Sequence, residues 1–151
     1  MILHLDRIDD PVSAEKSTVG GNVYLQIGDA YFPEENWYDI ASLIFENWFP
    51  ALCSFLHGST DFCKLTFWDG PCYVKLHRDS DLRITAECVY DNDRVIAETA
   101  IDFLAFVRSA IKAGNKFCRL LHAQGRDCEP VSSAVGKLKN ELRTIDISGP
   151  Y

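Results

Sequence analysis

The sequence predicts an α+β fold, in which an antiparallel β-sheet made of two hairpins plus N-terminal strands packs against two amphipathic helices. Three observations predict it. Apolar and polar residues alternate between residues 62 and 101, as in strands with one buried face. Segments on either side of that region space apolar residues by three and four, as in helices. The strands and helices are grouped and do not alternate strictly, which favours α+β.

The N-terminal third predicts two strands and a helix. Residues 2–8 alternate weakly, residues 9–21 have the composition of a loop, and residues 23–27 alternate clearly. A helix is expected to open at Pro33 in "FPEENWYDIASLIFENWF", because proline suits a first helical turn and acids complement a helix N-terminus. Pro50 should kink or restart this helix, and Gly58 should end it. Its expected apolar stripe contains Trp37, Ile40, Ala41, Ile44, Trp48, Leu52 and Phe55.

Two hairpins are predicted next. In the first, the turn is "WDGP" (68–71), and Lys75 and His77 should point away from the core. The expected inward pairs are Phe67–Cys72, Leu65–Val74 and Cys63–Leu76. The second hairpin should turn at "DNDR" (91–94). Its expected inward residues are Leu82, Ile84, Ala86, Cys88 and Tyr90, facing Val95, Ala97, Thr99 and Ile101.

A second helix is predicted from an N-cap at Asp102 to about Gly125, with a basic stripe opposite its apolar one. The basic stripe consists of Arg108, Lys112, Lys116 and Arg119, and we interpret it as a solvated face. The tail, residues 126–151, is ambiguous. Val135, Leu138, Leu142 and Ile145 have helical spacing after a cap at Ser132 or Ser133, whereas "RTIDISGPY" could form a short strand; we favour the helix.

The composition is that of one globular domain of 151 residues, with its core at about residues 19–125. The N-terminal sequence does not resemble a secretory signal, so we expect a soluble, cytoplasmic protein. The six cysteines show no zinc-site spacing. Those at 63, 72, 88 and 118 fall at apolar positions, so we expect reduced core thiols.

The net charge of −7 is uneven along the chain. Residues 1–102 carry 18 acids and 7 bases, net −11, and residues 103–151 carry 4 acids and 8 bases, net +4. An acidic body argues against nucleic acid as a direct ligand and favours basic protein partners, although acidity also serves solubility.

No nucleotide, hydrolase or metal motif is present in the sequence, and no cofactor is expected. A Cys63–His57 pair is conceivable as a nucleophile and base, but no third group orients it. An enzyme or small-ligand binder would need a pocket between sheet and helices, where Trp37, Trp48, Tyr73 and a histidine could converge. Paired acids in the loops could do acid–base work or bind a divalent cation, but we interpret them by default as solvated turn residues.

The candidate site residues are instead an exposed aromatic and acids at the loop tips. They are Trp68, Asp69, Asp79, Asp81, Asp91 and Asp93. Large aromatics among charges suit a protein interface, and they also suit cross-strand packing. The sequence therefore predicts a partner-binding surface without catalytic residues.

The helix segment beginning "FPEENWYDI", the hairpin with "FWDGPCYVKL" and the run "ETAIDFLAFV" together resemble small bacterial immunity proteins of polymorphic toxin and contact-dependent inhibition systems. The resemblance covers about residues 19–125. It implies a non-catalytic inhibitor that binds a cognate, basic toxin domain and contacts neither nucleic acid nor membrane. A generic protein-interaction or regulatory domain remains the alternative.

Overall fold

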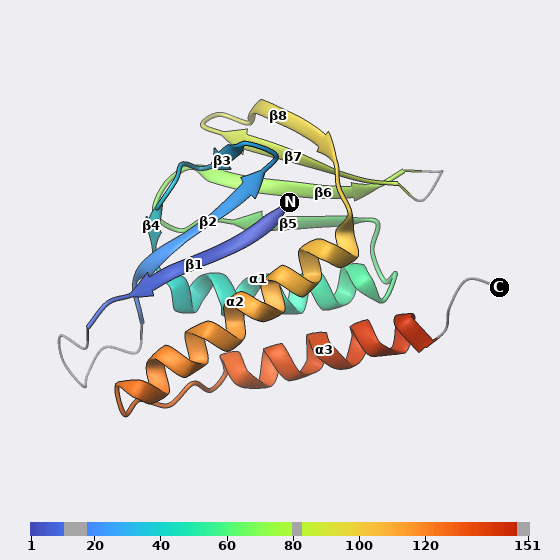
Figure 1. Cartoon of the computed structure of the whole chain (residues 1–151). Helices are drawn as coiled ribbons and strands as arrows, with labels where there is room; N and C mark the ends of the chain where they lie inside the picture. The colour runs from blue at the N-terminus through green and yellow to red at the C-terminus, as the bar shows by residue number, and fades with distance from the viewer. Residues whose placement is uncertain (11–17, 80–82, 148–151) are drawn as a thin grey trace.

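The computed structural model describes residues 1–10, 18–79 and 83–147, and it confirms the α+β class with two four-stranded antiparallel sheets and three helices (Figure 1). Residues 11–17, 80–82 and 148–151 lie outside the described part, and with them Asp81 and the expected inward residue Leu82. The strands are β1 (Ile2–Ile8), β2 (Gly21–Ile27), β3 (Ala30–Phe32), β4 (Tyr38–Asp39), β5 (Phe62–Thr66), β6 (Cys72–Arg78), β7 (Ile84–Tyr90) and β8 (Arg94–Ala100). The helices are α1 (Ala41–Leu56), α2 (Phe103–Ala123) and α3 (Val131–Ile147).

The N-terminal strands form a sheet of their own and do not extend the hairpin sheet. β2 is its central strand: β1 pairs along one edge, and β3 and β4 pair one after the other along the other edge. The inward side chains of β1 and β2 are Leu3, Leu5, Val23 and Leu25, all buried. Sequence alternation predicted β1 and β2. It gave no indication of β3 and β4, which pair with β2, or of two separate sheets.

The hairpins form the second sheet in the order β5-β6-β7-β8. The first hairpin has the predicted register, with Cys63 opposite Leu76 and Leu65 opposite Val74, and the Phe67 amide donates to the Cys72 carbonyl (3.0 Å). These six side chains are buried, whereas Lys75 and His77 lie on the opposite face.

The prediction of which β8 side chains face the core is wrong. The pairing shifts from Cys88–Ala97 to Val89–Val95, so Ile96 is an extra residue in a β-bulge, and alternation is broken there. β8 is also an edge strand, while α1 packs against β5 at the opposite edge of the sheet. Val95 and Ile96 consequently remain 45% and 50% exposed.

The first helix begins later than predicted, because α1 starts at Ala41 and not at Pro33. Residues 33–40 instead form a connection with the short strand β4, and Trp37 is not part of a helical stripe. Pro50 lies inside α1 at an exposed position and does not divide the helix, and Gly58 follows the helix end with φ +80°.

The predicted second helix is confirmed, since the Asp102 side chain caps α2 by accepting from the Ala105 amide (2.9 Å). The favoured helix in the tail is confirmed as α3, which begins at Val131, before the serines expected to cap it.

The core lies between the two sheets and the helices beneath them (Figure 1). The sheets meet through the Phe32 and Phe67 rings, whose centroids are 5.8 Å apart. The first and last thirds of the chain also join directly, because the Leu3 amide on β1 donates to Ser109 Oγ on α2 (2.9 Å). α2 approaches α1 and α3 so closely at Gly114 that an added Cβ would lie 2.6 Å from the Phe49 ring.

One cysteine prediction needs correction. Cys118 is not a reduced core thiol, because it forms a disulfide with Cys128, which ties the end of α2 to the segment before α3. Cys63, Cys72 and Cys88 are free and buried, as predicted.

Candidate functional site

Four of the six predicted site residues come together at one end of the second sheet. Trp68 and Asp69 belong to the β5–β6 turn, and Asp91 and Asp93 belong to the β7–β8 turn. In a meander of antiparallel strands these two turns lie at the same end, and here they touch: the Asp91 amide donates to the Pro71 carbonyl (3.0 Å). We call this group, with Tyr38 and Asp9 described below, the acidic tip.

The β5–β6 turn is held from below by a buried carboxylate of the short strand β4. Asp39 is fully buried at the end of β4. It accepts from the backbone amides of Trp68 (3.0 Å) and Asp69 (3.2 Å), which belong to the turn. It also accepts from the Ile40 amide (2.6 Å) and from Trp37 Nε1 (3.0 Å). Four N–H groups thus surround one buried carboxylate, which compensates the cost of removing its charge from water.

The turn is also held from the side. Trp37 packs its ring against Gly70, where an added Cβ would lie 3.1 Å from the ring. Gly70 has φ +142°, in a region that residues with side chains rarely adopt. Glycine is therefore favoured at this position by its conformation, and an added Cβ would also press on the Trp37 ring. The consequence is a fixed backbone from which the Trp68 side chain projects, 47% exposed.

The β7–β8 turn is a loop of three residues closed by the pair Tyr90–Arg94. Asp91, Asn92 and Asp93 have φ values of 29°, 51° and 61°, in the left-handed region that Asp and Asn tolerate better than most residues. The Tyr73 hydroxyl donates to the Asp93 carboxylate, which fixes the loop to β6. Both carboxylates of this turn are exposed beside the first turn.

Tyr38 and Asp9 extend the same surface onto the first sheet. The Tyr38 hydroxyl donates to Asp9 Oδ2 (2.5 Å), and the ring is 45% exposed. The hydrogen bond to Asp9 is the main cause that raises the Tyr38 pKa, and the negative charge of Asp69 adds to it. Tyr38 therefore stays a neutral phenol between two carboxylates. The tip combines exposed aromatics with four acids that the folded chain holds close together.

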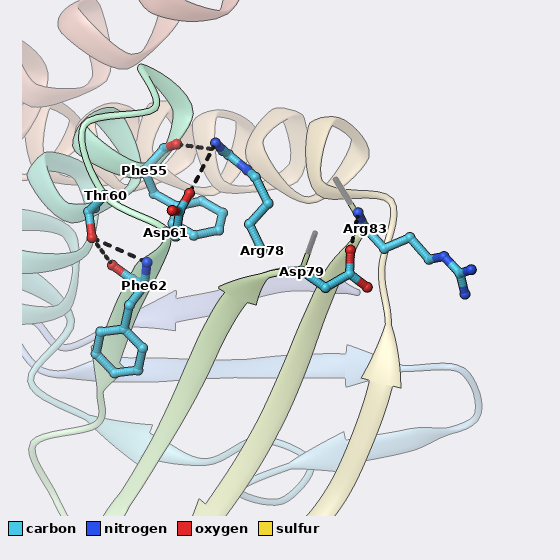
Figure 2. A network of polar contacts seen from close by, with 7 residues as sticks. All are labelled: Phe55, Thr60, Asp61, Phe62, Arg78, Asp79 and Arg83. Atoms are coloured by element: carbon cyan, nitrogen blue, oxygen red, sulfur yellow. Dashed lines mark hydrogen bonds and ion pairs between the residues drawn. The ribbon is translucent and has the colours of Figure 1, made fainter. Parts of the chain in front are cut away.

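Asp79 lies at the opposite end of the second sheet, so the structure separates it from the acidic tip. It accepts from the Arg83 amide (2.9 Å) and closes the β6–β7 connection (Figure 2). Arg78 at that end donates to the Phe55 carbonyl (2.9 Å) and lies 3.7 Å from Asp61 (Figure 2). A cation at this carbonyl complements the C-terminal end of α1. A cavity of about 370 Å³ beside it is lined by both arginines and the start of α2.

The aromatic residues that could have formed an enzyme pocket do not converge. Trp48 is buried and donates to the Thr66 carbonyl (2.8 Å), Trp37 lies on Gly70, and Tyr73 lies on the outer face under Lys64. Burial raises the pKa of Cys63 to about 12 and of Cys72 and Cys88 to about 11, which makes these thiols poor nucleophiles at neutral pH. His57 is exposed and lies 3.4 Å from Glu141.

Within residues 1–10, 18–79 and 83–147, no group of three or more His, Cys, Asp or Glu side chains could hold a metal ion. In the same part of the chain, no helix is both long enough and apolar enough to cross a membrane. No protein-family model matches the chain, and neither curated proteins nor solved structures show significant similarity to it.

Sequence reasoning missed three members of this site, Asp39, Tyr38 and Asp9. All three act through contacts with distant segments: Asp39 binds a turn 29 and 30 residues away, and Tyr38 binds Asp9 across 29 residues. The one local sign was an acid between Tyr38 and Ile40, immediately before an apolar helix. A carboxylate in such surroundings has to find donors or remain exposed.

Proposed function

We propose that the chain is a non-catalytic inhibitor, an immunity protein that neutralises a cognate toxin domain by binding it through the acidic tip. The observation that carries the proposal is the exposed Trp68 side chain on a turn whose backbone is fixed by the buried Asp39 carboxylate. Tryptophan is among the residue types most enriched at energetic hot spots of protein interfaces.

The rigidity of the turn supports a binding role. A side chain on a preformed loop loses less conformational entropy when a partner binds, so more of its contact energy remains as affinity. Both turns of the tip are preformed, one by Asp39 and Gly70 and the other by its bond to Pro71 and the Tyr73–Asp93 contact.

The charge of the acidic tip favours a partner with a basic surface. Asp9, Asp69, Asp91 and Asp93 form a negative group around aromatic side chains, and the neighbouring bases include Arg7, Lys64 and Arg94. Such a surface attracts a basic protein and accelerates association at low salt. Toxin domains that act on nucleic acid carry basic surfaces, so an acidic inhibitor that covers such a surface would exclude the substrate. The resemblance to immunity proteins supports this inhibitor reading over a generic interaction domain.

The test co-expresses the chain with each candidate toxin domain found in its gene neighbourhood. Co-expression should restore growth, and the two proteins should co-purify and separate at high salt. Trp68→Ala should weaken the complex at least about 30-fold, as for a hot-spot residue. Asp69→Asn/Asp91→Asn/Asp93→Asn should mainly slow association. The matched control is Phe62→Ala, which removes an aromatic that is 50% exposed at the far end of the same sheet and should change affinity less than about threefold.

Circular dichroism and thermal unfolding of each variant separate lost binding from lost folding. If Trp68→Ala and the triple variant both protect cells as well as the unchanged chain does, the acidic tip is not the inhibitory surface. If the complex forms but growth is not restored, the chain is an interaction domain without immunity function.

A further inference from the structure

The outer face of the first sheet carries a second group of aromatic and acidic side chains. Pairing across the strands places Ile2, Gln26 and Tyr31 in one row, His4 and Tyr24 in the next, and Asn22 and Tyr38 in a third. We call this surface the tyrosine face. Ile2, Tyr31 and Tyr38 on it are 46%, 38% and 45% exposed.

The side chains of the tyrosine face hold one another in place. The His4 and Tyr24 rings stack with centroids 5.1 Å apart, and Tyr31 meets Tyr24 edge to face at 5.6 Å. Tyr24 donates to Asp6 Oδ2 (2.7 Å), and His4 Nε2 lies 3.0 Å from Gln26 Oε1. The face is therefore ordered before any partner arrives, which lowers the entropic cost of binding.

The charge of this region is strongly negative. Residues 1–10 and 18–40 contain seven acids and one base among the described residues. One of the acids, Asp39, is buried, and the base, Arg7, donates to Asn22 Oδ1 (2.7 Å). The remaining acids include Asp6, Glu34 and Glu35, all exposed. Besides Arg7, the face has Lys112 and Lys116 of α2 near it, across a groove of about 220 Å³ at the β1 edge.

The tyrosine face is continuous with the acidic tip, because Tyr38 belongs to both. A stable protein–protein interface takes about 20–30 residues on each side, which is more than the six residues of the tip supply. From Asn22 to Gln26 the sheet adds a length of about 13 Å. An interface that covers both surfaces comes closer to that size than the tip alone does.

We infer that the tyrosine face is the second half of the contact surface and docks an arginine- and lysine-rich surface of the same protein partner. Guanidinium groups stack on exposed tyrosine rings and pair with neighbouring carboxylates, and this face presents both groups in fixed positions. The inference rests on the proposed function, but it makes a separate statement about which residues touch the partner.

The test needs no knowledge of the partner, because the probe is a peptide of alternating arginine and serine with nine arginines. It is titrated into the ¹⁵N-labelled full chain at low and at physiological salt. Amide shifts should concentrate on β2, on β3, on residues 33–38 and on the two turns of the tip. Tyr31→Ala should weaken binding about two- to fivefold, the size of an exposed cation–π contact.

The matched charge variants decide between a local site and general attraction. Glu34→Gln/Glu35→Gln and Asp61→Asn/Glu98→Gln both change the net charge from −7 to −5, but only the first pair lies beside the tyrosine face. The first pair should weaken binding about three- to tenfold and the second less than twofold. Equal weakening by both pairs, or shifts spread evenly over the chain, would overturn the inference.

A third variant, Asp69→Asn/Asp91→Asn/Asp93→Asn, separates the test of the tyrosine face from the test of the proposed function. If only this variant weakens peptide binding, the tip binds cations and the tyrosine face does not, so the inference fails while the proposed function stands. If the Glu34/Glu35 variant weakens binding but the chain protects cells from none of the candidate toxins, the face is a basic-protein site and the immunity proposal fails.

Discussion

Replacing Asp39 by asparagine tests the link between the buried carboxylate and the exposed turn. Oδ2 of Asp39 receives Trp37 Nε1 and the Asp69 amide, and Oδ1 receives the Ile40 amide. Asparagine keeps one accepting oxygen, so its NH2 group must face one or two N–H donors in either orientation. Each buried donor left without an acceptor costs about 1–3 kcal/mol. We therefore expect Asp39→Asn to lower the free energy of unfolding by about 2–4 kcal/mol.

Urea unfolding followed by tryptophan fluorescence measures this change. Asp69→Asn is the matched control, because it removes the same charge from an exposed side chain one residue beyond Trp68 and should change stability by less than about 0.5 kcal/mol. Hydrogen exchange gives a local readout: the Trp68 and Asp69 amides should be protected in the unchanged chain and exchange faster in Asp39→Asn. Equal stability of the two variants, or equal exchange at these amides, would refute the reasoning.

Three further predictions concern packing and cysteine chemistry. Gly114→Ala should destabilise the fold by about 1–3 kcal/mol, because the added methyl group overpacks the contact between three helices. Gly136→Ala is the control: no atom lies within 4 Å of its added Cβ, so it should stabilise by up to about 1 kcal/mol. Similar Tm shifts for both variants would contradict the close approach of the helices at Gly114. Reduction of the Cys118–Cys128 disulfide, whose cysteines are 10 residues apart, should lower stability by about 2–3 kcal/mol in urea unfolding, and an unchanged midpoint would mean that the bond contributes nothing. The buried free thiols have pKa values raised from 9.0 to about 11–12, so the folded state holds their protons longer than the unfolded state, and stability should be constant below pH 9 and fall as the pH rises towards 12. A disulfide-exchange reagent at pH 8 should therefore label only half-buried Cys53 without denaturant, and labelling of all four free thiols would refute their burial.

The first hairpin and the second helix could be predicted closely because local signals decide them. Alternation fixes which residues of a hairpin share a face, and the turn at "WDGP" fixes the register. Asp102 is a capping residue placed immediately before an amphipathic pattern. In both elements the local preference of the chain agrees with its tertiary environment.

The remaining errors arise where distant contacts override a local pattern. The segment beginning "FPEENWYDI" has helical spacing, but Trp37 packs on Gly70 and Asp39 binds the Trp68 turn, and both contacts hold the chain in an extended form. The bulge at Ile96 and the edge position of β8 likewise depend on the whole sheet. Asp69, Asp91 and Asp93 of the acidic tip could be recognised from the sequence as loop acids. That they lie together at one end of the sheet follows only from the strand order.

The hydrogen bond from the Leu3 amide to Ser109 Oγ has a consequence for the order of events during synthesis. The two residues are 106 positions apart, so at 5–20 residues per second the ribosome needs roughly 5–20 seconds between them. During that interval β1 can pair with β2, but the side of it that α2 later covers stays open to other strands and to chaperones. β1 is thus synthesised well before the helix that covers it, and its open edge needs protection from other strands during that interval.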